Sequence, residues 1–288
     1  MSSHDWVIPA ERASTMTAPD DLVARRSGMG AVVVPEPPEG VEVIPTTVAG
    51  VACVVCRPAV WARTIAYFHG GGYRLGSARV STGFGIRLVE ATGCQVVVVD
   101  YRLAPEHPFP AALHDAVGVV VELARHEPEG VVVAGDSAGG GLAAAVVAAA
   151  VGSGRPVPAA LVALSPWLDL ACTAGTFTSR AESDQLFSLA SASAAAELYL
   201  QGHDPADPLV SPLWADLAGF PPTLVLASGA EVLLDDALAL VAGLARAGRV
   251  VEAHLVPDLP HVWPTLLPDH PESVRALAVI ARFLSDRT

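Results

Sequence analysis

Lysine and asparagine are both absent from this 288-residue chain, and each absence excludes a class of chemistry. Without lysine the chain has no phosphate-binding lysine of a Walker loop, no Schiff-base lysine, no Ser-Lys dyad and no kinase-type lysine. Without asparagine it has no acceptor for N-glycosylation. A GC-rich coding sequence would explain both absences, and the chemical exclusions hold whatever their origin.

Charge is also scarce, and it is mostly of one sign. Charged residues make up 16% of the chain, and 17 arginines stand against 30 acidic residues, so the net charge is −13. A surface this acidic repels nucleic acid and anionic lipid, so neither is expected as a partner. Hydrophobic residues make up 52%, which excludes a disordered chain and predicts one large domain or at most two small ones.

No apolar run is long enough to cross a membrane without interruption. The most apolar stretch, Val131–Val151, contains Asp136, Ser137 and four glycines, so we interpret it as a strand, a turn and a buried helix. The first six residues lack a basic segment followed by an apolar run, so no signal peptide is expected. The sequence therefore predicts a cytoplasmic protein.

Cysteine is limited to four residues. Cys53 and Cys56 have the C-x-x-C spacing of a metal site, but no second ligand pair accompanies them. Their valine-rich surroundings are typical of a strand interior, where free cysteines are usually inert. No metal site is expected.

From about residue 41 onward, short β-branched runs come first and then alternate with longer alanine-rich segments. Unbroken apolar runs such as Gln95–Val99 indicate strands buried on both faces, as in a parallel sheet covered by helices. The first two or three strands lack intervening helices, so they predict an antiparallel edge. The expected fold class is therefore α/β, with a mostly parallel, doubly wound sheet. The predicted strands are Val41–Val48, Val51–Arg57, Arg63–Phe68, Gln95–Val99, Gly130–Ala134, Ala160–Leu164, Thr223–Ala227 and Glu252–Val256. The predicted helices are Gly83–Ala91, Pro110–Arg125, Ser137–Val151, Asp235–Ala247 and Pro271–Leu284.

Two regions do not follow this alternation. Residues 1–40 contain a Pro-Glu-Pro-Pro-Glu-Gly segment and only scattered apolar residues. Residues 170–212 interrupt the sheet with short helical segments, of which Ala192–Gln201 is the clearest. An insertion that follows the end of a strand is where a lid over a pocket would lie.

The segment Gly135–Gly139 has the pattern G-x-S-x-G, with serine at Ser137. It follows a predicted strand and precedes a predicted helix, which is the setting in which this pattern presents a nucleophile on a tight turn. The amide of Ala138 at the helix start would face developing negative charge. The alternative is a glycine-rich connection that only permits close packing of helix on strand. A nucleotide-phosphate loop is disfavoured, because the run fits neither common phosphate-binding pattern.

A second glycine-rich segment, His69–Gly72, follows the predicted strand Arg63–Phe68. Consecutive glycines let backbone N–H groups face a pocket with no side chain between them, as an oxyanion hole requires. We assign Gly71, Gly72 and Ala138 as its donors. His69 is expected to hold the loop by a hydrogen bond rather than to act in catalysis. The alternative is a flexible turn.

A serine nucleophile needs a base, and four histidines follow Ser137 in the sequence. Where G-x-S-x-G lies between a strand and a helix in this way, the order along the chain is nucleophile, acid, histidine, so the base comes late. His203 lies in the insertion, His254 inside a predicted strand and His270 at a helix start. His261 lies in a loop just after the last predicted strand, so we assign it as the base, with a surface loop histidine as the alternative.

The third residue of the expected catalytic triad is an acid that orients the histidine, and it should follow the strand Thr223–Ala227. Glu231 is the first carboxylate after it, whereas Asp235 and Asp236 are expected to open the next helix, where negative charge favours the helix dipole. We assign Glu231 the role of orienting His261. Asp235 as the acid, or an exposed loop glutamate without a role, are the alternatives.

With these motifs in place, the sequence resembles the α/β-hydrolases similar to hormone-sensitive lipase, including bacterial carboxylesterases. The resemblance covers roughly residues 60–285 and is carried by a conjunction of motifs in the right order. The matching segments are His69-Gly-Gly-Gly-Tyr73, Asp100-Tyr-Arg-Leu-Ala-Pro-Glu-His-Pro-Phe-Pro-Ala-Ala-Leu113 with Asp115, Gly135-Asp-Ser-Ala-Gly-Gly140, Ser165-Pro-Trp167 with Asp169, Asp207-Pro-Leu-Val-Ser-Pro212, Glu231-Val-Leu-Leu-Asp-Asp236 and His261.

The resemblance implies an α/β-hydrolase fold with a small helical cap and no cofactor. The cap would consist of an N-terminal segment, residues 1–40, and an insertion, residues 170–212, on a core of residues 41–169 and 213–288. It further implies an ion pair between Arg102 and Glu106 below the site. Many family members have aspartate where this chain has Glu231, and glutamate also occurs there in some.

The function expected from these residues is hydrolysis of carboxylic esters through an acyl-enzyme, with a small-molecule ester as the partner, and the resemblance implies acyl chains of short to medium length. A lactone hydrolase, deacetylase or amidase with the same triad stays open, as does a non-catalytic binding member of the fold. Trp167, Trp214 and Trp263 are expected near the pocket, where they suggest an apolar group of modest size. An edge strand or the cap could support a homodimer.

Overall fold

A computed structural model describes residues 19–127 and 129–286, in which eight strands form one sheet in the order β1-β2-β4-β3-β5-β6-β7-β8. β2 pairs antiparallel with both β1 and β4, and the remaining neighbours pair parallel. The predicted α/β class, with an antiparallel edge on a parallel sheet, is confirmed. The strands are β1 (Val41–Val48), β2 (Val51–Pro58), β3 (Thr64–Phe68), β4 (Gln95–Val99), β5 (Val132–Asp136), β6 (Ala160–Leu164), β7 (Thr223–Ser228) and β8 (Val251–Val256).

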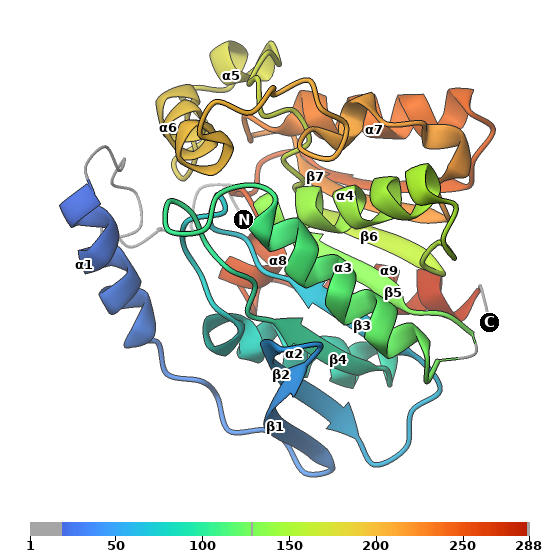
Figure 1. The fold of residues 1–288 in the computed structure, drawn as a ribbon. Helices are drawn as coiled ribbons and strands as arrows, with labels where there is room; N and C mark the ends of the chain where they lie inside the picture. Colours follow the sequence, from blue (N-terminus) through green and yellow to red (C-terminus); the bar gives the residue numbers. More distant parts are fainter. Residues whose placement is uncertain (1–18, 128, 287–288) are drawn as a thin grey trace.

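Helices cover both faces of the sheet, as Figure 1 shows. On one face the core includes residues of α3, α4 and α7, and on the other it includes residues of α2 and α9. The helices are α1 (Pro19–Gly30), α2 (Ala78–Thr92), α3 (Ala111–Ala124), α4 (Ala138–Ser153), α5 (Thr176–Ser179), α6 (Leu189–Leu200), α7 (Leu234–Arg246), α8 (Trp263–Leu266) and α9 (Pro271–Ser285), with short 3₁₀ turns at Pro212–Trp214 and Leu217–Gly219.

The central strands β3, β5, β6 and β7 are buried along their whole length, which explains their unbroken apolar runs. Helix α4 is buried continuously from Ala138 to Ala148, so it is apolar all round and has no polar face. This helix carries the serine turn at its start. The turn is therefore anchored by a strand and a helix that both lie in the core.

Several element boundaries differ from the sequence prediction. The strand predicted at Gly130–Ala134 is β5, two residues later, because Gly130 has a φ of +80° and Asp136 still pairs with Leu164 of β6. Helix α2 begins before the predicted Gly83, because the Ser77 side chain accepts a hydrogen bond from the Val80 amide and caps the helix.

The segment predicted as residues 1–40 contains helix α1, which stands at one side of the molecule in Figure 1 and which the sequence pattern did not indicate. Residues 1–18 of the predicted segment lie outside the described residues. The guanidinium of Arg26 on α1 bonds the carbonyl oxygens of Arg74 and Ala104 and the carboxylate of Glu106, the last at 2.7 Å. The expected Arg102–Glu106 pair is therefore wrong. Arg102 instead pairs with Asp115 at 2.8 Å.

The insertion follows the carboxyl end of β6, and its helices α5 and α6 lie together above the layers in Figure 1. Helix α6 begins at Leu189, earlier than predicted, because the Ser188 side chain caps the amide of Ser191. The division of the chain into core and cap stays a prediction.

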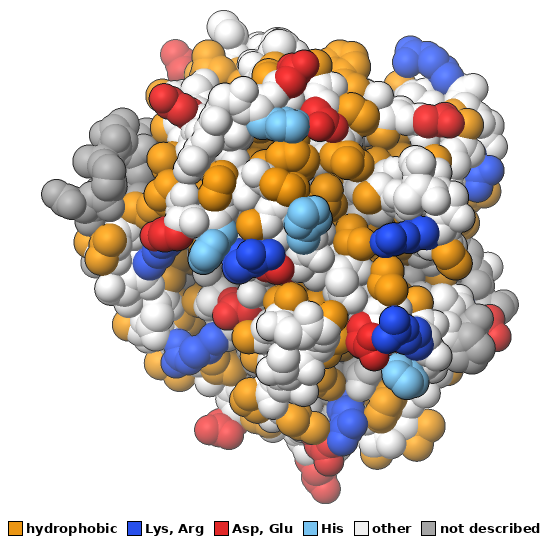
Figure 2. Space-filling model, viewed as in Figure 1, with side chains coloured by type: hydrophobic (Ala, Val, Ile, Leu, Met, Phe, Trp, Pro, Cys, Tyr) orange, Lys and Arg blue, Asp and Glu red, His pale blue; other side chains and the backbone are white. Residues whose placement is uncertain are grey.

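Cys53 and Cys56 are free, buried thiols on β2. Burial raises the pKa of the Cys53 thiol to about 11 and that of Cys56 to about 12, so both are inert at neutral pH. On the face shown in Figure 2, acidic and arginine side chains are interspersed among hydrophobic ones. In the described part of the chain, no helix is both long and apolar enough to span a membrane.

Candidate active site

Ser137 lies on the tight turn between β5 and α4. Its φ of 54° and ψ of −122° are strained for a side-chain-bearing residue. A Cβ on Gly135 would collide with the backbone of Gly139, and a Cβ on Gly139 would collide with the carbonyl oxygen of Phe68. The two glycines of the motif are therefore required by the close approach of the helix to the ends of two strands.

His261 lies in the loop after β8, and two serines hold that loop in place. The Val262 amide donates to Ser165 Oγ at 3.2 Å, from the end of β6. Ser228 Oγ at the end of β7 donates to the Leu259 carbonyl and accepts from the Leu259 amide. The histidine loop is thus tied to the carboxyl ends of two neighbouring strands.

The imidazole of His261 contacts both other residues of the expected triad. Its Nε2 lies 2.8 Å from Ser137 Oγ, and its Nδ1 lies 2.7 Å from Glu231 Oε2. These three residues come from separate strand ends, and all three are buried. The arrangement can transfer the serine proton to the imidazole while the carboxylate holds the Nδ1–H tautomer.

The other three candidate histidines lie elsewhere. His203 bonds Asp207 at 2.7 Å, His254 lies on β8 with its ring 3.9 Å from Glu272, and His270 accepts the Glu272 amide at the start of α9. The position of His261 directly after the last strand was the signal that separated it from them.

Among the carboxylates after β7, Glu231 is the one that faces the imidazole. Its other oxygen accepts the Ser228 amide at 2.6 Å, so the fully buried carboxylate is fixed at both ends. Asp235 instead accepts the Thr176 amide, and Asp236 accepts the amides of Leu168 and Asp169. Neither aspartate is placed to orient His261.

The electrostatic surroundings of His261 favour its charged form. Burial alone would lower its pKa, but the hydrogen bond and charge of Glu231, together with the charges of Asp184 and Asp136, outweigh burial. The net result is a pKa above the ordinary value of 6.5. An imidazolium formed during a reaction would therefore be stabilised at this position.

The loop His69–Gly72 lies beside the serine turn. Gly71 and Gly72 have φ values of +122° and +62°, which glycine adopts without strain. Within the described ranges, no acceptor bonds the amides of Gly71, Gly72 or Ala138. These three predicted donors are therefore available to an oxyanion.

Asp136, the residue before the serine, holds the first part of this loop. Its Oδ1 accepts the Gly70 amide at 2.9 Å and the Tyr67 hydroxyl at 2.5 Å. His69 Nδ1 lies 2.8 Å from the Gly70 carbonyl oxygen and its ring stacks on Tyr101, which is the structural role expected for it. The motif pattern gave no indication of the bond from Asp136, since that position is variable in G-x-S-x-G.

The insertion contributes an aromatic side chain that the sequence did not single out. The ring of Phe187 stacks on His261 with centroids 5.8 Å apart, and it packs edge-on against Trp167 at 5.5 Å. Of the three tryptophans expected near the pocket, Trp167 adjoins the site. The prediction is wrong for Trp214, which is 58% exposed, and for Trp263, which lies in the core on the α2 and α9 face.

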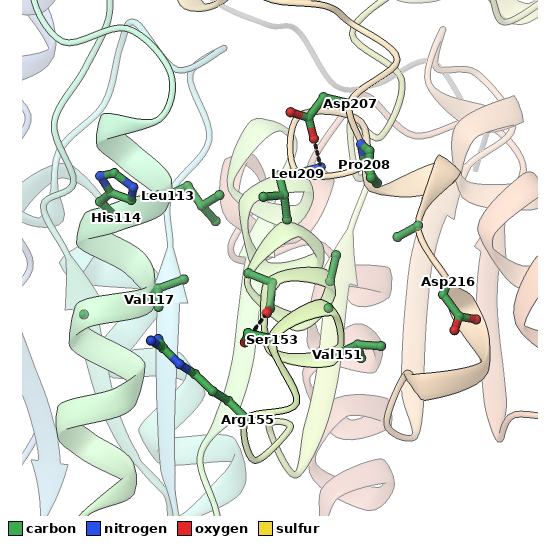
Figure 3. Close-up of a pocket in the computed structure, with 15 residues that line it drawn as sticks. Leu113, His114, Val117, Val151, Ser153, Arg155, Asp207, Pro208, Leu209 and Asp216 are labelled. Atoms are coloured by element: carbon green, nitrogen blue, oxygen red, sulfur yellow. Dashed lines mark hydrogen bonds between the residues drawn. The ribbon is translucent and has the colours of Figure 1, made fainter.

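A surface cavity of about 840 Å³ lies away from the triad, between α3, the second half of α4 and the segment 207–216 (Figure 3). Arg155 extends across it toward Val117, and Asp207 and Asp216 lie on the opposite side. No triad residue lines this cavity.

In the portion of the chain that the structure describes, no cluster of three or more His, Cys, Asp or Glu could hold a metal ion.

Comparison with known proteins identifies the family of the chain. A family model described as the alpha/beta hydrolase fold matches residues 65–265. A solved structure described as an esterase from the bacterial hormone-sensitive lipase family is 38% identical, with a TM-score of 0.88, and covers 96% of this chain and 94% of its own. The chain belongs to the α/β-hydrolases similar to hormone-sensitive lipase.

Curated relatives of this hydrolase carry related names. An acetyl-hydrolase of Streptomyces hygroscopicus is 43% identical over 228 residues, which are 78% of this chain and 76% of the relative. An esterase of Acinetobacter venetianus is 34% identical over 247 residues, which are 84% of this chain and 82% of the relative. The prediction of an enzyme of the carboxylesterase type is confirmed.

Proposed function

We propose that this hydrolase cleaves carboxylic esters with short- to medium-length acyl chains through an acyl-enzyme on Ser137. The observation that carries the proposal is the pair of hydrogen bonds at His261, 2.8 Å to Ser137 Oγ and 2.7 Å to Glu231 Oε2. The relative named acetyl-hydrolase supports an acetyl group as one of the acyl groups accepted.

In the proposed first half-reaction, Ser137 Oγ bonds to the ester carbonyl carbon while its proton passes to His261 Nε2. Glu231 stabilises the resulting imidazolium, and the amides of Gly71, Gly72 and Ala138 donate to the oxyanion. The tetrahedral intermediate then collapses, the bond to the alcohol oxygen breaks, and His261 returns the proton to the leaving alcohol.

In the second half-reaction, water takes the place of the alcohol. His261 Nε2 accepts a proton from water as the water oxygen bonds to the acyl carbon, and the same amides hold the second oxyanion. Collapse breaks the bond to Ser137 Oγ and returns the proton to it. The acid is released and the free enzyme is restored without a cofactor.

In the proposed arrangement, residues 41–169 and 213–288 form the core that carries out the reaction, and residues 1–40 and 170–212 form the cap that encloses the substrate.

A homodimer through an outer strand or the cap is part of the proposal. Its test is the molar mass of the purified protein by light scattering during size exclusion, where a value near the 29.6 kDa of one chain would argue against it.

The test of the mechanism is hydrolysis of p-nitrophenyl acetate, butyrate and octanoate by the purified protein. Ser137→Ala should lose about 10⁴-fold or more of the rate, whereas His270→Ala, which removes a histidine at the start of α9, should keep it. Labelling with a fluorophosphonate followed by peptide mapping should place the adduct on Ser137. Turnover retained by Ser137→Ala would eliminate the mechanism, and matched lactone and amide substrates separate the alternative activities.

A further inference from the structure

The insertion is bonded to the loop that carries the proposed acid. Asp184 is 8% exposed, and its Oδ2 accepts the amide of Val232, the residue after Glu231, at 2.9 Å. Its neighbour Ser183 donates through Oγ to the Ala230 carbonyl at 2.7 Å. The residues on both sides of Glu231 are therefore held by two consecutive residues of the insertion.

The same carboxylate also shapes the turn that carries Phe187. Asp184 Oδ1 accepts the amides of Leu186 and Phe187, both at 3.0 Å. That turn directs the Phe187 ring onto the face of His261. One buried side chain thus accepts three amide hydrogen bonds, one on the acid loop and two on the turn above the imidazole.

We propose that Asp184 is a positioning residue for the ester hydrolysis proposed above. It acts through Glu231 and Phe187 to hold the His261 imidazole at hydrogen-bonding distance from Ser137 Oγ. The insertion is then part of the catalytic framework as well as a cover. Since the inference rests on the proposed function, its test includes the nucleophile variant.

The charge of Asp184 also bears on the imidazole. The groups that face His261 electrostatically are Glu231 on the acid loop, Asp184 in the insertion and Asp136 before the nucleophile, and all three are acidic. Without the charge at Asp184, burial still lowers the pKa of His261, and only Glu231 and Asp136 among these three groups still raise it. The pKa of His261 should therefore fall, which moves the acid limb of the rate profile to lower pH.

The informative variant is Asp184→Asn, which has the same shape. The amide oxygen of the asparagine can accept the bonds of one carboxylate oxygen, either those from Leu186 and Phe187 or the one from Val232. Its NH₂ group then replaces the other oxygen and faces a backbone N–H, so two donors are brought together. We expect kcat for p-nitrophenyl acetate to fall about 10- to 100-fold, since small displacements of reacting groups have effects of that size. We also expect the acid limb to shift to lower pH, which a purely structural role would not produce.

Two further measurements show whether Asp184 acts through the acid. In a Glu231→Gln background, Asp184→Asn should add little further loss, because the orientation it supports is already gone. Asp184→Glu, which keeps the charge, should restore the acid limb while recovering only part of kcat. The matched control is Asp204→Asn, which changes an exposed carboxylate of the same insertion whose side chain accepts the nearby Ala206 amide, and it should behave as wild type.

The outcomes separate the two levels of inference. An inactive Ser137→Ala together with a wild-type kcat and acid limb in Asp184→Asn would overturn the role of Asp184 and leave the ester hydrolase intact. Fully additive losses with Glu231→Gln would overturn it as well. If Asp184→Asn does not fold, Ser183→Ala carries the test, since it removes an exposed hydroxyl that bonds the Ala230 carbonyl beside Glu231 and the Arg180 carbonyl within the insertion. A severalfold loss of kcat supports the inference, and an unchanged kcat refutes it.

Discussion

The carboxylate of Asp136 accepts the amide of Gly70 at 2.9 Å, which ties the nucleophile turn to the start of the glycine loop. The same oxygen accepts the Tyr67 hydroxyl. The serine and two of the proposed oxyanion donors are thus held relative to each other by the residue just before the serine. A change at this position should act on the transition state more than on substrate binding.

The first prediction concerns this link. Asp136→Ala removes the acceptor and should lower kcat for p-nitrophenyl acetate about 10- to 100-fold with a smaller change in KM. Asp136→Asn keeps an oxygen that can accept both bonds, so it should stay within about fivefold of wild type. Equal losses in the two variants would show that the charge, and not the acceptor, is what matters.

The second prediction separates the two candidate acids. Glu231→Gln removes the charge that stabilises the imidazolium and should lower kcat/KM by about 10²- to 10⁴-fold. Asp235→Asn should remain within about threefold of wild type, because Asp235 bonds the Thr176 amide and not His261. Steady-state kinetics on one ester decides the matter, and the reverse ranking would reassign the acid to Asp235.

The third prediction is the pH dependence of the reaction. His261 must be neutral to accept a proton, so kcat/KM should rise as pH increases through its pKa, which lies above 6.5 in the folded protein. In Glu231→Gln the opposing effect of burial gains weight, so the residual activity should rise at lower pH than in wild type. An acid limb that stays in place in that variant would argue that another group titrates.

The fourth prediction concerns stability. Burial raises the pKa of Asp236 from 3.8 to about 7. Between these values the folded protein keeps a proton that the unfolded chain releases, so the free energy of unfolding falls as pH rises. Above about pH 7 the cost is constant, and below about pH 4 it vanishes because the carboxyl is protonated in both states.

Asp236→Asn should remove this cost, since an amide oxygen can still accept the amides of Leu168 and Asp169. At pH 8 we expect the variant to be more stable than wild type by about 2–4 kcal/mol, and the difference should disappear near pH 4. Urea unfolding at the two pH values measures it, with Asp235→Asn as the control. A variant less stable than wild type at pH 8 would mean that the carboxylate is bound in its charged form.

The sequence was sufficient for the parts of the fold where local pattern and burial agree. Unbroken valine runs such as Gln95–Val99 can only be strands covered on both faces, and the helix after Ser137 is apolar all round. It was insufficient for α1, which has few apolar residues and is attached to residues far along the chain through the Arg26 guanidinium and the packing of Leu22 with Leu75. The wrong pairing of Arg102 with Glu106 has the same origin, since the partner that Glu106 finds in the structure is Arg26, 80 positions away in the sequence.

What the sequence determined by itself is the order of strand, turn and helix, and with it the residues that stand at the strand ends, because hydrophobic periodicity and glycine are local properties. Only the tertiary structure decided that Asp184 bonds the loop of Glu231, that Phe187 stacks on the imidazole and that Asp136 holds the glycine loop. Those contacts join segments that are distant in sequence, and the partners of the two aspartates are backbone amides, which nearly every residue supplies and no motif marks.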